Sequence, residues 1–448
     1  MTGFPISMGQ AVEHDAALPE RADVVIVGGG VIGITAAWYL ARKGQRVVVV
    51  EKGRVAAEQS ARNWGWIRQT GRDRAELPIM VEALSRWREL AEAAGEDIGL
   101  RTCGITFLGA DEKKLAAFEA WLPEARANGV DSRMMSRAEL AAMMPGAARS
   151  WAGALHTPSD ICAEPFVAVP ALARGAARAG VTIIEGCAAR GLDIVAGRVA
   201  GIMTEKGRIA CERVLVAAGA WSALFLRREG VKIPQLSVRS NVLATGSVAD
   251  VHDGAAGESG MAFRRRADGG YTLASSGFYE FWIGPDAFRA LPHYRQLLMG
   301  DPFGPSYRLF APGGYPDAWG TKRRWSLDEQ SPFERMRILD PEPNARALAD
   351  VLRRFEETFP ELGKVPVARQ WAGMIDTMPD VVPVVDEADT LPGLFICTGM
   401  CGHGFGIGPA FGRTMADLIC GDSPGHDLSR FRLSRFSDGS KLELGPDL

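Results

Sequence analysis

The order of apolar and polar residues near the start of the chain predicts a strand, a helix and a second strand. Residues 24–27 and 47–50 are short runs of valine and isoleucine, which are typical of strands buried on both faces. Residues 34–42 form an apolar segment of helical length between them. This order predicts a βαβ unit whose two strands run parallel.

The same criteria predict further elements along the rest of the chain. Helices are expected at residues 76–94, 112–127, 136–144, 165–179, 344–359 and 409–419, with Ser136 and Glu139 spaced as a capping box. Strands are expected at residues 101–108, 181–185, 198–204, 208–211, 214–217, 270–275 and 394–397. Residues 60–73 and 278–343, which are rich in glycine and aromatic residues, match neither pattern.

A glycine motif lies at the turn between the first strand and the helix. Gly28, Gly30 and Gly33 have the spacing G-x-G-x-x-G. The first permits a sharp turn, the second lets a pyrophosphate approach the backbone, and the third lets the helix pack closely on the strand. Glu51 ends the second strand, where its carboxylate can accept hydrogen bonds from a ribose. Glycines also cluster in ordinary turns, but this combination favours a dinucleotide site, for either NAD or FAD.

Two further segments join a strand to a helix through glycine. Residues 214–217 turn through Gly219 into a helix that starts near Trp221, and residues 394–397 lead through a glycine-rich turn, residues 399–408, into a helix. Three such segments, far apart in the sequence, predict one discontinuous cofactor domain with insertions.

We therefore expect an α/β protein with a discontinuous Rossmann-like cofactor domain and an α+β substrate domain on a mostly antiparallel sheet. The cofactor domain takes residues 21–75, 150–235 and 366–432, and the substrate domain takes residues 76–149 and 236–365; a flexible leader, residues 1–20, and a C-terminal tail, residues 433–448, complete the chain.

Composition limits the class of protein. The 448 residues suggest two or three domains, and 51 basic against 54 acidic residues give a net charge of −3, which argues against a nucleic-acid partner. The start of the chain lacks the features of a signal peptide, and no apolar run is long enough for a membrane span, so we expect a cytoplasmic protein. The seven cysteines are scattered, which fits reduced thiols and no metal site.

At this point the sequence resembles the D-amino-acid oxidase superfamily of flavoproteins, in particular glycine oxidase, monomeric sarcosine oxidase and D-amino-acid dehydrogenases. The motifs are the GGGVIG turn with Glu51, AAGAWS at residues 217–222, WAG…TMPD…P at residues 371–383, and GHGFGIGPAFG at residues 402–412. The resemblance implies FAD and oxidation of a carbon–nitrogen bond by hydride transfer to the flavin, which gives an imine that hydrolyses.

The resemblance also implies where FAD binds. Residues 60–65 are expected along the flavin ring and pyrophosphate, and residues 404–407 at the pyrimidine edge. Relatives with covalent FAD carry a cysteine at the place of Gly373, so noncovalent FAD is expected. The predicted cofactor residues are Gly28, Gly30, Val31, Ile32, Gly33, Glu51, Lys52, Ser60, Arg62, Asn63, Trp64, Gly65, Ala218, Gly219, Trp221, Gly373, Gly402, Gly404, Phe405, Gly406 and Ile407.

Two carboxylate-binding residues of such relatives are missing. Where some relatives have an arginine before the TPD element, this chain has Met374, Ile375 and Asp376, and where others have a lysine after GHGF it has Gly406. Arg68 is then the best candidate to hold a substrate carboxylate. The alternative interpretations are a surface arginine or a pyrophosphate contact.

Three other residues are candidates for substrate contact. Asp376 either selects a substrate with a second cationic group or is an acid that caps a loop. His403 either lies over the flavin, where it holds the substrate or tunes the ring, or is satisfied by nearby backbone. Tyr279 is the expected polar tip of an aromatic pocket.

The substrate is expected to be a small amine or amino acid, with O2 or a quinone as electron acceptor. No lysine stands in residues 270–277, where oxidase relatives often keep one over the flavin, which favours a dehydrogenase. Oxidation of a carbon–oxygen bond in a hydroxy acid or polyol is the alternative within enzymes, since related folds do both. A nonenzymatic or tRNA-modifying FAD-binding protein would need a basic surface or a binding tail, and the sequence indicates neither.

Overall fold

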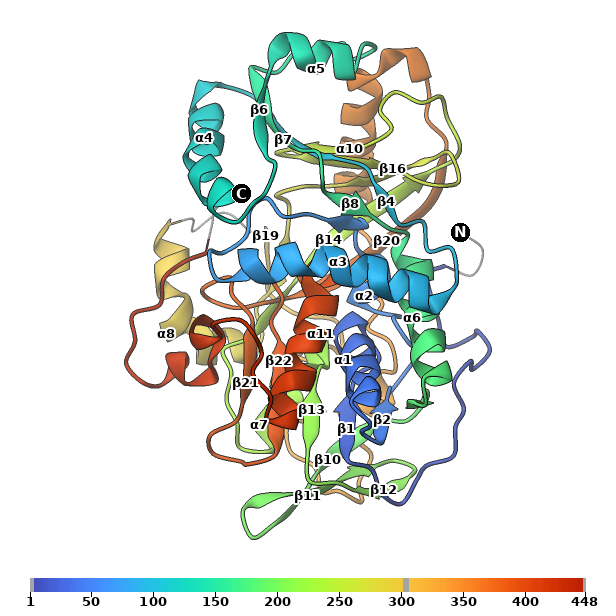
Figure 1. Ribbon diagram of the computed structural model, residues 1–448, viewed down its shortest axis with the longest axis vertical. Helices are drawn as coiled ribbons and strands as arrows, with labels where there is room; N and C mark the ends of the chain where they lie inside the picture. The colour runs from blue at the N-terminus through green and yellow to red at the C-terminus, as the bar shows by residue number, and fades with distance from the viewer. Residues whose placement is uncertain (1–3, 301–305, 446–448) are drawn as a thin grey trace.

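The computed structural model describes residues 4–300 and 306–445. The lower part of the molecule in Figure 1 is built on a six-stranded sheet in which five neighbouring strands run parallel. Because parallel strands point the same way, the three glycine-rich turns that follow β1, β13 and β22 meet at one edge of this sheet. The strand order is β21 (Val384–Glu387), β22 (Leu394–Thr398), β13 (Val214–Val216), β1 (Val24–Val27), β2 (Val47–Val50) and β9 (Thr182–Ile184).

Helices cover this sheet in close contact. α1 (Val31–Arg42) packs against α6 (Pro165–Arg178) and α11 (Gly404–Cys420), and α3 (Glu76–Ala94) crosses α6 and α11 (Figure 1). A Cβ atom at Gly412 would lie 2.2 Å from Thr35 Oγ1, so glycine is what allows α1 and α11 to approach. Thr35 Oγ1 donates to Val31 O of its own helix at 2.7 Å and lies 3.2 Å from Gly408 O of α11. The two helices therefore pack closely near the start of α11.

The second sheet has ten strands and is mostly antiparallel. Its order is β19 (Ser306–Arg308), β18 (Glu280–Trp282), β14 (Leu236–Thr245), β17 (Tyr271–Ala274), β16 (Met261–Arg265), β15 (Ala255–Glu258), β5 (Ile105–Gly109), β7 (Gly153–Thr157) and β6 (Arg133–Ser136), while β20 (Val367–Thr377) pairs with β14. α10 (Ala345–Thr358) packs on β14, β16 and β17, and α4 (Glu112–Ala127) and α5 (Arg137–Met143) pack near β6 and β7.

The remaining elements are two small sheets and several short helices. Two small sheets are β3 (Trp66–Ile67), β8 (Ile161–Cys162), β4 (Arg101–Thr102), and β10 (Ala189–Val195), β11 (Arg198–Thr204), β12 (Gly207–Ala210). The short or late helices are α2 (Gln59–Arg62), α7 (Ser222–Arg228), α8 (Pro285–Gly300) and α9 (Pro332–Arg335), with 3-10 turns at Gly219–Trp221, Pro360–Leu362, Ser429–Phe431 and Leu433–Phe436. Of the helices described, none is both long and apolar enough to cross a membrane.

The α/β class, the parallel cofactor sheet and the capping box of Ser136 with Glu139 are confirmed. Some boundaries are wrong. Residues 60–73, for which no element was expected, contain part of α2 and β3, and residues 278–343 contain β18, α8, β19 and α9, although 301–305 lie outside the described residues. α11 begins at Gly404, because packing on α1 and α3 outweighs the low helix propensity of its glycines.

Residues 4–20 do not form a leader outside the fold. Phe4 is buried against Phe166 and Trp371, with ring centroids at 5.3 and 4.9 Å, and Asp15 forms a bridge with Ile184. The apolar residues of this segment follow neither helical nor strand spacing, so the sequence did not indicate this contact.

Two strands belong to a different sheet from the one that the predicted domain ranges imply. β7 and β20 fall in ranges expected for the cofactor domain, yet both form ladders within the ten-stranded sheet. The eleven-residue β20 pairs with β14 along nearly its whole length, so it joins the two parts of the molecule.

The close approach of α1 and α11 leads to a stability prediction. Gly412→Val should lower the free energy of unfolding by roughly 1–3 kcal/mol, because the added side chain meets Thr35 and the backbone of Ala36. Urea denaturation followed by circular dichroism measures this. Gly313→Val is the matched control, since an added Cβ there meets no atom within 4 Å. Equal stability of the two variants would contradict the packing argument.

Candidate active site

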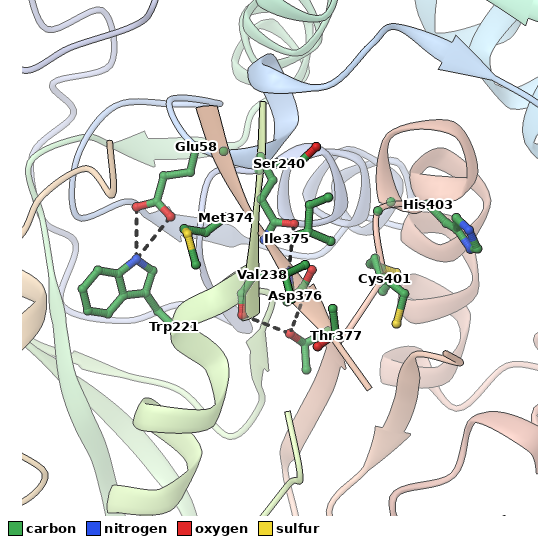
Figure 2. A pocket seen from close by; sticks show the side chains of 18 of the residues that line it. Glu58, Trp221, Val238, Ser240, Met374, Ile375, Asp376, Thr377, Cys401 and His403 are labelled. Atoms are coloured by element: carbon green, nitrogen blue, oxygen red, sulfur yellow. Dashed lines mark hydrogen bonds between the residues drawn. The ribbon is translucent and has the colours of Figure 1, made fainter. Parts of the chain in front are cut away.

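A cavity of about 860 Å³ lies where the six-stranded sheet meets the ten-stranded sheet. Its walls come from the ends of β1 and β2, from much of residues 54–72, from β14 and β20, and from the loop before α11. Side chains of β18 and α8 close another wall. In Figure 2, β14 and β20 cross the view between Trp221 on one side and His403 on the other. The cavity therefore connects the predicted cofactor region with the predicted substrate region.

The first glycine turn presents its backbone to this cavity. Gly28 has a φ of 111°, and an added Cβ would lie 2.5 Å from Ala217 O, so glycine is required there. At Gly30 the nearest atom to an added Cβ is Ser60 Oγ, at 3.1 Å, and this hydroxyl accepts a hydrogen bond from Val31 N at 2.9 Å. A pyrophosphate fits against this backbone at the start of α1.

Glu51 is fixed at the end of β2. Gly29 N donates to its Oε2 at 2.8 Å, and Gly53 N donates to its Oε1 at 2.7 Å. Burial raises the pKa of Glu51, while Lys52 and these two N–H groups act in the opposite direction. The side chain lines the cavity, in the position that a ribose-binding acid occupies in a dinucleotide fold.

Glu58 connects two of the predicted cofactor residues. Lys52 Nζ lies 2.6 Å from Glu58 Oε1 and 4.4 Å from the ring centroid of Trp221. Trp221 Nε1 donates to the same carboxylate at 3.1 Å, as Figure 2 shows. Glu58 stands in no recognisable motif, so sequence reasoning missed it; its role is to fix the side chains around it.

Residues 59–66 pass along the cavity and are tied to the large sheet at two points. Arg62 Nη1 donates to Ala372 O of β20 at 2.9 Å, and Arg264 Nε of β16 donates to Trp64 O at 2.7 Å. These bonds hold the segment that is expected beside the flavin.

The start of α11 supplies a second set of backbone donors. His403 is the N-cap residue, and the first helical residue, Gly404, lines the cavity. The first N–H groups of a helix lack intrahelical partners and carry a partial positive charge. Gly406 and Ile407 point into the core instead: Gly406 O accepts from Trp87 Nε1 at 2.9 Å, and Ile407 is fully buried.

The structure brings most predicted cofactor residues to the cavity. Those that line it are Gly28, Gly30, Val31, Ile32, Glu51, Lys52, Ser60, Arg62, Asn63, Trp64, Ala218, Gly219, Trp221, Gly373, Gly402, Gly404 and Phe405. Gly33, Gly65, Gly406 and Ile407 are not among the lining residues. Gly33 and Gly65 serve close packing, since an added Cβ would lie 2.0 Å from Gly28 O and 2.4 Å from Ala163 O, respectively.

Asp376 reaches the cavity from β20 but is held by backbone. Its Oδ2 accepts from Gly399 N at 2.8 Å and from Thr398 Oγ1 at 3.4 Å, and the residue is 2% exposed. Burial raises the pKa of Asp376. These contacts favour the interpretation of a loop-capping acid over a site for a substrate cation.

Arg68, His403 and Tyr279 line the same cavity. Arg68 Nη2 lies 3.3 Å from His403 Nε2, and Nη1 donates to the backbone carbonyls of Thr70 and Gly71. Burial raises the pKa of Tyr279, and the nearby positive charge of Arg68 partly offsets this. Within the described residues, no carboxylate lies within ion-pair distance of Arg68.

Three ionisable residues behind Arg68 were not predicted. Arg72 is buried and donates through Nε and Nη2 to Arg68 O at 3.1 Å. Burial, and to a smaller extent the positive charge of Arg68, lowers the pKa of Arg72 to about 9. Glu76 is buried beside His403, with Oε2 at 3.5 Å from Nδ1. Asp160 accepts from Gln69 N at 2.9 Å, and burial raises its pKa to about 7.

The glycine turns at this cavity are typical of a dinucleotide-binding protein, and within the described residues Arg68 on its wall has no carboxylate partner. A profile of the FAD dependent oxidoreductase family, abbreviated DAO, matches residues 23–418. The chain therefore belongs to this family, and the resemblance inferred from its motifs is confirmed.

Individual relatives agree with this assignment. The structure of L-amino acid deaminase from Proteus myxofaciens in complex with anthranilate has 32% sequence identity and a TM-score of 0.91, covering 96% of this chain and 97% of that one. Sarcosine oxidase subunit beta from Rhizobium meliloti is 25% identical over 94% of this chain and 90% of its own length. Human mitochondrial sarcosine dehydrogenase is 25% identical over 94% of this chain, which spans 42% of that longer protein. The prediction of an FAD-dependent oxidoreductase of amino acids or amines is confirmed.

The turn at Gly30 gives a prediction about cofactor binding. Gly30→Val should abolish FAD binding, because the side chain would stand against Ser60 Oγ where the pyrophosphate approaches the backbone. The ratio of flavin absorbance to protein absorbance after purification measures this. Gly320→Val, at a position where an added Cβ meets nothing within 4 Å, should keep its flavin. Stoichiometric FAD in Gly30→Val would refute the assigned role.

Proposed function

We propose that this protein oxidatively deaminates L-α-amino acids with apolar side chains, using noncovalently bound FAD. The observation that carries the proposal is the cationic edge of Arg68, which faces the cavity without an acidic partner among the described residues. A substrate carboxylate would complete this edge. The L configuration is supported by the identity of 32% to the L-amino acid deaminase from Proteus myxofaciens.

The hydrogen bonds of Arg68 leave the required donors free. A guanidinium carries five N–H donors. Nη1 is taken by Thr70 O and Gly71 O, and Nη2 gives one donor to His403. The Nε–H and the second hydrogen on Nη2 have no partner in the described part of the chain, and they lie on the edge that binds a carboxylate with two hydrogen bonds.

Residues of this chain would hold three parts of FAD. When bound, FAD accepts the hydride that leaves the α-carbon of the substrate. Glu51 would hold the ribose, and the backbone at Gly28–Val31 would hold the pyrophosphate. The N-terminus of α11 would stabilise negative charge at the pyrimidine edge. Water then hydrolyses the imine product to a 2-keto acid and ammonia.

The substrate end of the cavity is apolar. Its aliphatic and aromatic side chains are Leu236, Val238, Phe281, Ile283, Phe288, Leu291, Leu297 and Leu298. Such a wall suits an apolar substrate side chain, and it disfavours the charged ammonium form. Hydride loss requires the neutral amine, so desolvation and catalysis favour the same protonation state.

Noncovalent attachment is supported by the state of the nearby thiols. Gly373 stands where relatives with covalent FAD have cysteine, and Cys397 and Cys401 line the cavity. Burial raises the pKa of both thiols, and Cys401 Sγ lies 3.2 Å from both Met378 N and Gly399 O. Protonated, hydrogen-bonded thiols are poor nucleophiles. Acid precipitation should therefore release free FAD into the supernatant.

A quinone is the electron acceptor that the lining favours. Among the described residues, the one lysine on the cavity wall is Lys52, and it is bound to Glu58 and to the carbonyls of Met336 and Arg337. Within the described residues, the cavity wall therefore offers no lysine that is free to activate O2. Reoxidation of the reduced enzyme by a soluble quinone, compared with air, tests this choice.

The reaction class is tested by anaerobic bleaching of the flavin with paired isosteres. L-phenylalanine should bleach the flavin and yield phenylpyruvate and ammonia, whereas D-phenylalanine and L-3-phenyllactate should leave it oxidised. Bleaching by the hydroxy acid alone would instead establish carbon–oxygen oxidation, and the proposal would be wrong.

The role of Arg68 leads to a prediction for two variants. Arg68→Met should lower kcat/KM for the amino acid roughly a hundredfold or more, because two hydrogen bonds to a charged carboxylate are lost. Arg68→Lys should restore part of this, since a lysine supplies the charge but not the paired donors. Steady-state kinetics with a dye acceptor, at equal FAD content, measures both. Unchanged kcat/KM in Arg68→Met would exclude Arg68 as the carboxylate ligand.

A further inference from the structure

We propose that Glu76 is a positioning residue: through His403 it holds the Arg68 guanidinium in the orientation that receives the substrate carboxylate. This inference rests on the proposed function of Arg68. Glu76 is the first residue of α3, so it is also placed where acids stabilise a helix N-terminus. An acid at a helix start is normally exposed, so this placement alone does not explain why the Glu76 carboxylate is buried.

The Glu76 carboxylate is buried at 1% exposure. Neither of its oxygens has a hydrogen bond of normal geometry among the described residues, and its one contact within ion-pair distance there is with His403 Nδ1, at 3.5 Å from Oε2. Burial alone would raise the pKa of Glu76, but His403 and Arg72 outweigh it, so the pKa lies below its usual range. A buried, ionised carboxylate is costly without a partner, which makes the contact with His403 its main compensation.

The contacts from Arg68 to His403 and from His403 to Glu76 allow only one assignment of donors and acceptors. Arginine only donates, so His403 Nε2 must accept the hydrogen bond from Arg68 Nη2 at 3.3 Å. The imidazole is therefore neutral and carries its proton on Nδ1, the nitrogen that lies 3.5 Å from Glu76 Oε2. Burial and the positive charges of Arg72 and Arg68 lower the pKa of His403 to about 4, although Glu76 raises it, so the ring stays neutral at physiological pH.

Removal of the carboxylate would free the imidazole. The other tautomer would place an N–H on Nε2 and direct it at Arg68, so two donors would face each other and the guanidinium would turn. The Nε and Nη2 edge of Arg68 would then no longer meet the carboxylate of the substrate. Glu76 acts in this way without contact with substrate or cofactor, and it is absent from the residues that line the cavity.

The test compares a substrate that has a carboxylate with one that lacks it. In the FAD-loaded enzyme, Glu76→Gln should lower kcat/KM for L-phenylalanine about tenfold, the effect of one hydrogen bond to a charged group, but kcat/KM for 2-phenylethylamine by less than about twofold. Glu82→Gln is the matched control on the same helix: its carboxylate binds Arg413 and His426, so both substrates should react as in wild type. An equal loss for both substrates in Glu76→Gln would assign Glu76 to helix stability and overturn the inference.

A direct measurement of the His403 tautomer tests the role of Glu76 independently of Arg68. Nitrogen-15 NMR of the histidine rings, with the His403 signals assigned through His403→Asn, should show the Nδ1–H tautomer in wild type and a mixture of tautomers in Glu76→Gln. If Arg68→Met discriminates between the two substrates and Glu76→Gln does not, the positioning role fails while the proposed function stands. If Arg68→Met also fails to discriminate, the proposed function fails first.

Discussion

The partly buried positive charge of Arg68 is the constraint on which the candidate site depends. A cation away from bulk water is costly unless polar groups or an anion compensate it. The protein supplies backbone carbonyls at Thr70 and Gly71 and an imidazole acceptor at His403, but within the described residues it supplies no ion-paired carboxylate. We propose that an anionic group completes this site, and that the group is the carboxylate of the substrate, because Arg68 lines the cavity.

The two sheets hold this charge beside the cofactor region. β14 and β20 pair from Leu236↔Thr377 to Thr245↔Val367. Both strands line the cavity, so one continuous ladder forms part of its wall. Trp371 Nε1 on β20 donates to Arg62 O at 2.9 Å, and Arg62 donates back to Ala372 O. Arg264, paired with buried Glu164 at 2.9 Å, holds the next turn of the same segment. Contacts between residues far apart in the sequence therefore fix the geometry of the candidate site.

The parts that could be predicted from the sequence have local causes. Gly28 needs its positive φ and Gly30 leaves space beside Ser60, and the spacing of the motif indicates both; Glu51 follows a strand that the apolar run identifies. By contrast, Arg68 and His403 are 335 residues apart in the sequence, and no pattern in either segment predicts that they are in contact. Glu76 reads as an ordinary acid at a helix start, although its carboxylate is buried. α8 was missed because Pro292 lies inside it, although its cavity-lining residues 287, 291, 294 and 298 do have helical spacing.

The most direct test of the account is a binding titration with ligands that cannot be oxidised. Holoenzyme is titrated with benzoate and with its neutral isostere benzamide, and the perturbation of the flavin absorbance spectrum is recorded for wild type and for Arg68→Met. The account predicts saturable binding of benzoate to wild type, with little binding of benzamide and a loss of benzoate binding in the variant. Equal affinity for benzoate in wild type and Arg68→Met would contradict the claim that this guanidinium is the carboxylate site.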